Sequence, residues 1–175
     1  MKLSQFEFEL DDDDYIEGRS FQDNPDIFNG NQFHAIFLLP CERKDRKFDI
    51  NLNIESQVKF LGRIDRKNLI NEINDSNALV HSCPYETFGV VYVEALALGK
   101  PIVAVYSPGS LDILTKEVGI LSENNEVSMS NSMIEIFKRH DEFDPFYIRK
   151  YCRNNFSEDF LSKKMLDNYI SILSN

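Results

Sequence analysis

Residues 82–101 read SCPYETFGVVYVEALALGKP, and this stretch decides the fold of the chain. It begins as a loop, continues as a helix and ends at Gly99, a residue typical of helix C-termini, with Pro101 just beyond it. Short apolar runs of strand type flank it at residues 78–81 and 102–106. A strand, a helix and a strand in this order form a βαβ unit, which predicts a parallel sheet.

The helix in this stretch has apolar residues on all sides, which predicts that most of its surface is buried. These residues are Phe88, Val90, Val91, Val93, Ala95, Leu96, Ala97 and Leu98. Glu94 is the one charge inside the helix, and a buried carboxylate needs a partner or a ligand to offset its desolvation. Glu86 precedes the helix, where a negative charge interacts favourably with the helix dipole. The first turn, near Thr87 and Gly89, presents backbone N–H groups and predicts an anion site.

These motifs resemble the E-x7-E region of retaining GT-B glycosyltransferases of the group 1 or family 4 type, which include sucrose synthase and glycogen synthase. The resemblance rests on ETFG at 86–89, EA at 94–95 and GKP at 99–101. It extends to VKFLGR at 58–63, which resembles the family's strand-plus-glycine element, and to PGS at 108–110, which resembles its later glycine-rich donor loop. The matching part runs from about Val58 to the C-terminus.

The resemblance implies an α/β fold: a Rossmann-like three-layer domain with a mainly parallel sheet and C-terminal helices, which is one half of a GT-B fold. The length of 175 residues is that of one domain, which we expect to span residues 1–175. Residues 58–175 form its family-like part and residues 1–57 an atypical part, with an edge strand at 1–10 and a loop at 40–53. Residues 20–32 contain no lysine, although relatives carry one there that helps an arginine to hold the donor diphosphate.

The resemblance also implies roles for three side chains. Glu86 is the candidate catalytic residue, which contacts hydroxyls of the donor sugar. Glu94 lies at a ribose-contacting position, where its carboxylate accepts hydrogen bonds from the 2′- and 3′-hydroxyls. Arg63 lies near the nucleotide base. Purely structural roles stay open: a helix-start residue for Glu86, a buried ion pair for Glu94 and a solvent-facing arginine for Arg63.

Backbone groups complete the expected donor site. The further residues predicted to bind the nucleotide sugar are Thr87, Phe88, Gly89, Val90 and Gly109, the first four through amides that reach the diphosphate. A simple turn followed by an N-cap also explains the stretch around Gly109. His81 has no second ligand at metal-binding spacing, so a core or edge histidine is favoured over a functional one.

The C-terminal part predicts three more helices. The first runs to His140 and is capped by Ser128 or Ser130, the second spans residues 144–156, and the third begins at residues 157–159. In the third, apolar residues recur at helical spacing as a core-facing stripe: Phe160, Leu161, Leu166, Tyr169, Ile170 and Leu173.

The composition excludes some classes of function. The net charge of −10 argues against a nucleic-acid surface and against docking on anionic lipid through a basic patch. The three cysteines are widely spaced and predict reduced thiols in the cytoplasm. No signal peptide and no transmembrane segment is predicted, whereas peripheral membrane contact stays open.

Two functions therefore stay open. The first is a glycosyltransferase donor-binding domain that binds a UDP-, GDP- or ADP-sugar for retaining transfer without a metal or other cofactor. It needs a separate acceptor domain or partner subunit and is expected to be inactive alone. The second is a non-catalytic, degenerate GT-B-like binding or scaffold subunit.

Overall fold

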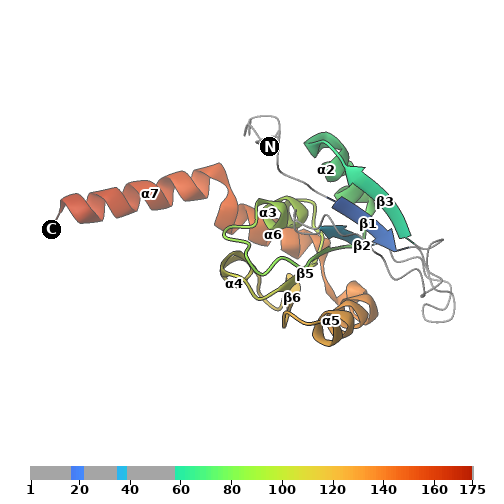
Figure 1. The fold of residues 1–175 in the computed structure, drawn as a ribbon. Coiled ribbons are helices and arrows are strands. Elements are labelled where there is room, and N and C mark those ends of the chain that lie inside the picture. The colour runs from blue at the N-terminus through green and yellow to red at the C-terminus, as the bar shows by residue number, and fades with distance from the viewer. Residues whose placement is uncertain (1–16, 22–34, 39–57, 175) are drawn as a thin grey trace.

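The computed structural model of the chain describes residues 17–21, 35–38 and 58–174 (Figure 1). The expected edge strand at residues 1–10 and the expected loop at residues 40–53 lie outside the described residues, as does most of the segment without a lysine. The division into an atypical part and a family-like part therefore stays a prediction.

The described residues form one six-stranded sheet. Its strands are β1 (Glu17–Phe21), β2 (Ala35–Leu38), β3 (Val58–Arg63), β4 (Ala78–His81), β5 (Ile102–Val105) and β6 (Gly119–Ser122). They lie in the order β3-β1-β2-β4-β5-β6. The pairs β2–β4, β4–β5 and β5–β6 are parallel, whereas β1 is antiparallel to both β2 and β3. The prediction of a mainly parallel sheet is confirmed, and β1 is an exception to it.

The core lies on the two central strands. Every residue of β4 and β5 is buried. A strand covered on both faces needs apolar side chains at every position and not only at alternate ones, which explains the continuous run Ile102–Val105. Leu69 and Ile73 from α2 and Ile136 from α5 complete the same core.

Helices cover the sheet on both sides. The helices of the described residues are α2 (Arg66–Asp75), α3 (Val90–Ala97), α4 (Pro108–Ile113), α5 (Glu126–Lys138), α6 (Pro145–Phe156) and α7 (Glu158–Leu173), with a 3-10 turn, η4 (His140–Glu142), before α6; α7 is not among those that cover the sheet. α5 packs on β5 and β6, and α6 packs on α3. Figure 1 shows α3 and α6 on one side of these strands and α5 on the other, which confirms the three-layer arrangement.

Local signals set most helix boundaries as predicted. Gly99 follows α3 with a φ of 77°, the left-handed conformation that ends many helices. Asp144 caps α6 and Ser157 caps α7 through their side chains. The predicted cap of α5 is wrong: Asn125 begins this helix and accepts a hydrogen bond from the backbone N–H of Ser128 at 2.9 Å.

α7 departs from the prediction of a core-facing stripe. It projects from the body of the domain in Figure 1, and among the described elements its main neighbour is α6. Because little of the described chain packs against it, its apolar residues are exposed, up to 85% for Leu173. The exposed residues include Phe160, Leu161, Met165, Leu166, Tyr169, Ile170, Ile172 and Leu173.

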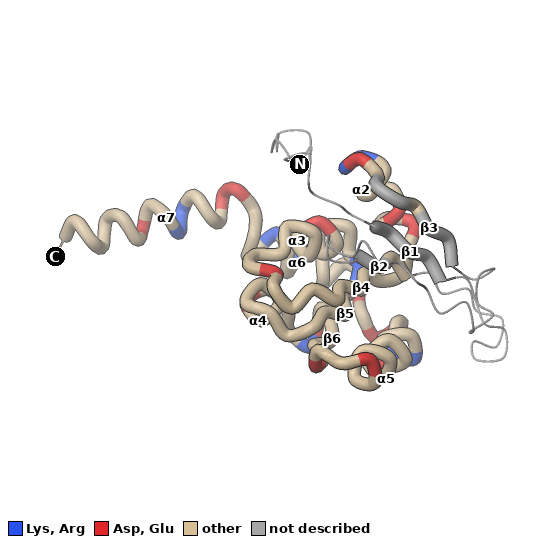
Figure 2. Tube along the Cα trace, in the orientation of Figure 1, with Lys and Arg blue, Asp and Glu red and all other residues tan. Residues whose placement is uncertain are grey.

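Charged residues are spread over the described elements. Figure 2 shows Asp and Glu on helices and loops throughout this part of the chain, with Lys and Arg interspersed among them. Among the helices of residues 66–173, none combines the length and the hydropathy that a membrane span requires.

Candidate functional site

Two loops meet at the carboxyl ends of the central strands, the edge at which open α/β sheets bind ligands. One follows β4 and leads into α3, and the other follows β5 and leads into α4. The backbone N–H of Gly109 donates to the carbonyl oxygen of Glu86 at 3.0 Å. A Cβ at Gly109 would lie 2.8 Å from the carbonyl carbon and oxygen of Phe88, so only glycine allows this approach. The two segments predicted to form the donor site are thus in direct contact.

Gly89 begins α3 in a conformation that other residues avoid. Its φ is 79°, in the left-handed region, and a Cβ there would lie 2.1 Å from Cδ2 of the Tyr92 ring. The ring of Tyr92 is itself fully buried beneath the loop. Glycine is therefore required at residue 89 both by the backbone and by the packing of Tyr92.

Glu86 acts as a cap on the start of α3. Its Oε1 accepts hydrogen bonds from the backbone N–H groups of Gly89 at 2.8 Å and Phe88 at 3.3 Å. The negative charge also lies at the positive end of the helix dipole. In this arrangement the carboxylate of Glu86 takes two of the amides that were predicted to bind a diphosphate, so an anion at these two amides would compete with it.

The next amides of the helix remain available. Within the described part of the chain, no acceptor is found for the backbone N–H groups of Val90 and Val91. Most of α3 is buried as predicted, but the side chains at its start are not: Phe88, just before the helix, is 54% exposed and Val90, its first residue, is 50% exposed. The exposed first turn leaves an anion free to approach these N–H groups.

Glu94 lies one turn further along α3 and pairs with Arg66 of α2. The Nε and Nη2 atoms of Arg66 lie 2.8 Å and 2.7 Å from the same carboxylate oxygen, Oε1. The side chain of Glu94 is only 10% exposed. For its other oxygen, Oε2, no donor is found among the residues that the structure describes.

Burial and the ion pair act in opposite directions on Glu94. Burial raises the pKa of its carboxyl group above the usual value, and the charge and hydrogen bonds of Arg66 lower that pKa in part. Arg66 therefore favours the ionised form of the Glu94 carboxyl group, against the effect of burial. The buried ion pair that was left open as a structural role for Glu94 is present, but it engages only one of the two oxygens.

His81, at the carboxyl end of β4, is part of the same region. Its Nδ1 lies 2.7 Å from the hydroxyl oxygen of Tyr92, and both side chains are buried. Burial lowers the pKa of His81, against the opposing effect of the Glu86 charge, and burial raises the pKa of Tyr92 above its usual range. The pair fixes the ring of Tyr92 beneath Gly89 and so supports the loop from below.

The His81–Tyr92 pair predicts a pH-dependent stability. The pKa of His81 is below 6.5 in the folded protein. The contribution of neutral His81 to the free energy of unfolding is therefore complete above pH 6.5 and is lost as the pH falls below it. A His81→Leu variant removes one hydrogen-bond partner of the buried Tyr92 hydroxyl, and its free energy of unfolding should be lower by about 1–3 kcal/mol at pH 7.5. We expect urea unfolding to show that the difference in free energy of unfolding between the unmodified chain and His81→Leu becomes smaller as the pH is lowered from 7.5 to 5. His140→Leu, in η4, is the control. If the loss of unfolding free energy in His81→Leu stays constant with pH, the prediction is contradicted.

The backbone of Arg63 lies away from the two loops. It ends β3, where it pairs with Glu17 of β1. β1 and β2 separate β3 from β4, which places the backbone of Arg63 about 14 Å from β4 at the usual strand spacing. The role of Arg63 at the nucleotide base stays a prediction, and Arg66, just beyond it, is the arginine that reaches α3.

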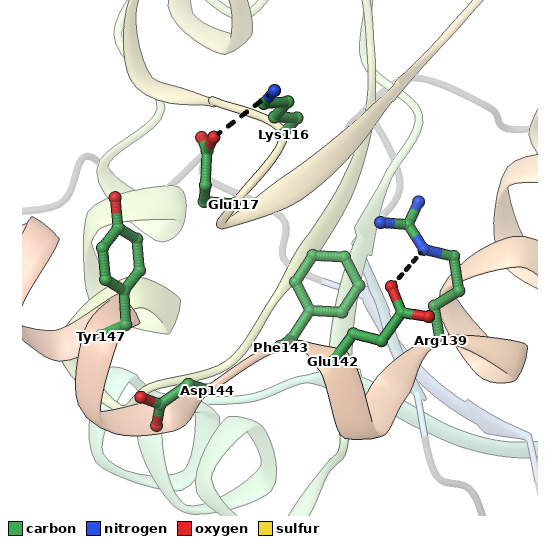
Figure 3. A pocket seen from close by; sticks show the side chains of 7 residues that line it. All are labelled: Lys116, Glu117, Arg139, Glu142, Phe143, Asp144 and Tyr147. Atoms are coloured by element: carbon green, nitrogen blue, oxygen red, sulfur yellow. Dashed lines mark hydrogen bonds and ion pairs between the residues drawn. The ribbon is translucent and has the colours of Figure 1, made fainter.

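A separate pocket of about 520 Å³ lies at the opposite edge of the sheet (Figure 3). Its lining consists of Lys116, Glu117, Arg139, Glu142, Phe143, Asp144 and Tyr147. The Nε of Arg139 donates to Glu142 Oε2 at 2.9 Å, and its guanidinium lies 5.7 Å from the centre of the Phe143 ring. Because this charge is already matched and no predicted site residue lines the pocket, it is not part of the candidate site.

Sequence reasoning missed Arg66 and Tyr92. For Arg66 a signal was present, because a cation in the first turn of a helix is unfavourable to the helix dipole and so indicates a partner elsewhere. For Tyr92 the one signal in the sequence was its place in an apolar helix. A tyrosine that is buried there needs a hydrogen-bond partner for its hydroxyl group.

Three proteins show what the chain is similar to. It is 31% identical over 94 residues to the GDP-mannose-dependent monoacylated alpha-(1-6)-phosphatidylinositol monomannoside mannosyltransferase of Corynebacterium glutamicum, covering 48% of this chain and 24% of that protein. It is 28% identical over 141 residues to the mouse GDP-Man:Man(3)GlcNAc(2)-PP-Dol alpha-1,2-mannosyltransferase, covering 73% of this chain and 28% of that protein. The crystal structure of Anabaena HepE in complex with UDP superimposes with a TM-score of 0.57 and 24% identity, over 70% of this chain and 34% of that one.

The chain thus spans about a quarter to a third of the length of these proteins. The structural likeness shows that the fold is that of the C-terminal domain of GT-B glycosyltransferases. The family model described as glycosyl transferases group 1 matches residues 42–152, which is more than half of the chain. The chain therefore belongs to the glycosyl transferases group 1 family.

Proposed function

We propose that this chain binds a nucleoside-diphosphate sugar at the carboxyl edge of its sheet, as the donor-binding half of a retaining glycosyltransferase. A separate domain or subunit supplies the acceptor, and the chain alone is inactive. Glu86 contacts the sugar, Glu94 holds the ribose, and the first turn of α3 binds the diphosphate.

The observation that carries this proposal is the state of Glu94. A carboxylate that is 10% exposed costs stability unless its oxygens are paired. Here Arg66 pairs with Oε1, while Oε2 has no donor among the described residues. Two neighbouring hydroxyl groups, as on a ribose, are the kind of donor that such an oxygen accepts.

The first turn of α3 supports a diphosphate at the neighbouring position. The N–H groups of Val90 and Val91 point outward from the helix start and have no acceptor in the described part of the chain. Glu86 already occupies the amides of Phe88 and Gly89. Both amides bind Oε1 of Glu86, so its other carboxylate oxygen can still contact a sugar, whereas a phosphate at these two amides would have to displace the carboxylate.

The relatives support more than one donor base. The names of both mannosyltransferases include GDP-mannose, or its abbreviation, and HepE was solved in complex with UDP. We therefore propose a GDP- or UDP-sugar, with an ADP-sugar as the remaining option. No metal is needed in this proposal, since backbone amides neutralise part of the diphosphate charge. The cytoplasm is the proposed location, in keeping with reduced thiols.

α7 supports the need for a further domain or subunit. Its exposed apolar residues would be stabilised by burial against another surface. The chain spans only about a quarter of the mannosyltransferases that it matches.

The second candidate is a binding or scaffold subunit without catalysis. It is favoured by the carboxylate of Glu86, which closes two of the predicted phosphate amides, and by the absence of lysine from residues 20–32. In this case Glu86 is only a helix cap and Arg66–Glu94 only an ion pair.

Nucleotide titration separates the two candidates. With a Kd near ~0.1 mM, 1 mM of nucleotide stabilises the folded state by about 1.4 kcal/mol, which raises Tm by about 3–5 °C for a chain of this size. We expect at least one of UDP, GDP and ADP to produce this shift in differential scanning fluorimetry.

Guanosine and uridine without phosphates are the matched controls, and they should shift Tm far less because the amides of α3 then bind nothing. The donor-binding function is wrong if none of the three diphosphates changes Tm at millimolar concentration. The remaining candidate would then be a scaffold subunit without catalysis.

A further inference from the structure

We propose that Arg66 is a positioning residue for nucleotide binding, which holds Glu94 by one carboxylate oxygen and leaves the other directed to the ribose. This inference rests on the proposed function and names a residue to which neither the resemblance nor the comparisons assign a role.

The geometry of the ion pair is the first argument. An arginine fork commonly binds a carboxylate through both oxygens, one for each nitrogen. Here Nε of Arg66 donates a hydrogen bond to Oε1 of Glu94 at 2.8 Å, and Nη2 forms an ion pair with the same oxygen at 2.7 Å. The pair therefore fixes the orientation of the carboxylate without using Oε2, for which the described residues supply no donor.

The position of Arg66 is the second argument. It is the first residue of α2, directly after the N-cap Asp65. A cation at this end of a helix is unfavourable to the helix dipole, so the stability of α2 does not explain it. The buried side chains of Leu69 and Ile73 anchor α2 in the core and hold the backbone of Arg66 in place.

The charge of Arg66 is the third argument. Burial favours the protonated form of Glu94, and Arg66 opposes this effect through its charge and its hydrogen bonds. A protonated carboxyl group has one acceptor oxygen fewer and a hydrogen of its own to place. Without Arg66, the binding of two ribose hydroxyls would therefore depend on pH.

Other titratable groups surround α3. They are His81, Glu86 and Tyr92 at its first turn, Arg149 and Cys152 on α6, and Lys100 after its end. Of the charged groups on the elements packed against α3, Arg66 is the one that acts on the pKa of Glu94.

The test measures the affinity for GDP and UDP at pH 8, 7 and 6 by calorimetry. For Arg66→Met we expect weaker binding at pH 8 and a further loss toward pH 6, at most about tenfold per pH unit. The unmodified chain should change less over this range, because the charge and the hydrogen bonds of Arg66 oppose the rise that burial causes in the pKa of Glu94. Arg139→Met removes an arginine that is also paired with glutamates but lies in the pocket at the other edge, and it should match the unmodified chain.

The outcomes are distinct. If the unmodified chain binds neither nucleotide, the proposed function fails, and this inference fails with it. If it binds and Arg66→Met has the same affinity and pH profile, only the inference is overturned. If Arg66→Met does not fold, Arg66→Lys carries the test: it keeps the charge but not the fork, so we expect several-fold weaker binding with little pH dependence. Unchanged affinity in Arg66→Lys would then overturn the inference.

Discussion

Gly89→Ala should lower the free energy of unfolding by about 2–4 kcal/mol. Two costs add. The φ of 79° is unfavourable for any residue with a Cβ, and that Cβ would lie 2.1 Å from the buried ring of Tyr92. The ring is held by His81, so it cannot move aside without losing a buried hydrogen bond. Chemical denaturation monitored by circular dichroism measures the change.

A second variant separates the two costs. In a Tyr92→Ala background the clash disappears and only the backbone cost of about 1–2 kcal/mol should remain for Gly89→Ala. An equal loss in both backgrounds would show that the Tyr92 ring does not restrict residue 89, and this part of the account would be wrong.

Glu94→Gln should weaken nucleotide binding by about tenfold or more, because hydrogen bonds to a charged group contribute about 1.5–3 kcal/mol. The substitution keeps the shape of the side chain and removes its charge. The sharper readout uses GDP and UDP with their 2′,3′-dideoxy analogues. The unmodified chain should prefer the natural nucleotide, and Glu94→Gln should lose most of that preference.

Glu135→Gln is the matched control. Glu135 is also paired with an arginine, Arg139, but it lies on α5 away from the candidate site. The nucleotide affinity and the ribose preference of the Glu135→Gln variant should equal those of the unmodified chain. If Glu94→Gln retains the full preference for the ribose hydroxyls, Glu94 does not bind the ribose.

Local signals in the sequence predicted the centre of the fold. The apolar runs of β4 and β5, the glycine after α3 and the caps of α6 and α7 depend on neighbouring residues, so periodicity and turn chemistry are sufficient to find them. The contact between Gly109 and the 86–89 loop was not predicted, but it agrees with the βαβ order, which brings the carboxyl ends of parallel strands together.

Long-range pairing could not be predicted in the same way. Nothing local indicates that β1 runs antiparallel between β2 and β3, because its direction depends on which strands it pairs with. Arg66 and Glu94 are 28 positions apart, and their contact depends on how α2 packs against α3. The exposed stripe of α7 also could not be foreseen, because helical periodicity shows an apolar face but not what covers it.

The most direct test of the central claim is a crystal structure of the chain grown with GDP or UDP, in which the distances from the ribose hydroxyl oxygens to Glu94 are measured. We expect the 2′- or 3′-oxygen to lie about 2.6–3.0 Å from Oε2 of Glu94, a usual hydrogen-bond length, with Arg66 still bound to Oε1. A nucleotide whose ribose lies elsewhere, with Oε2 of Glu94 paired to a protein group instead, would contradict the claim.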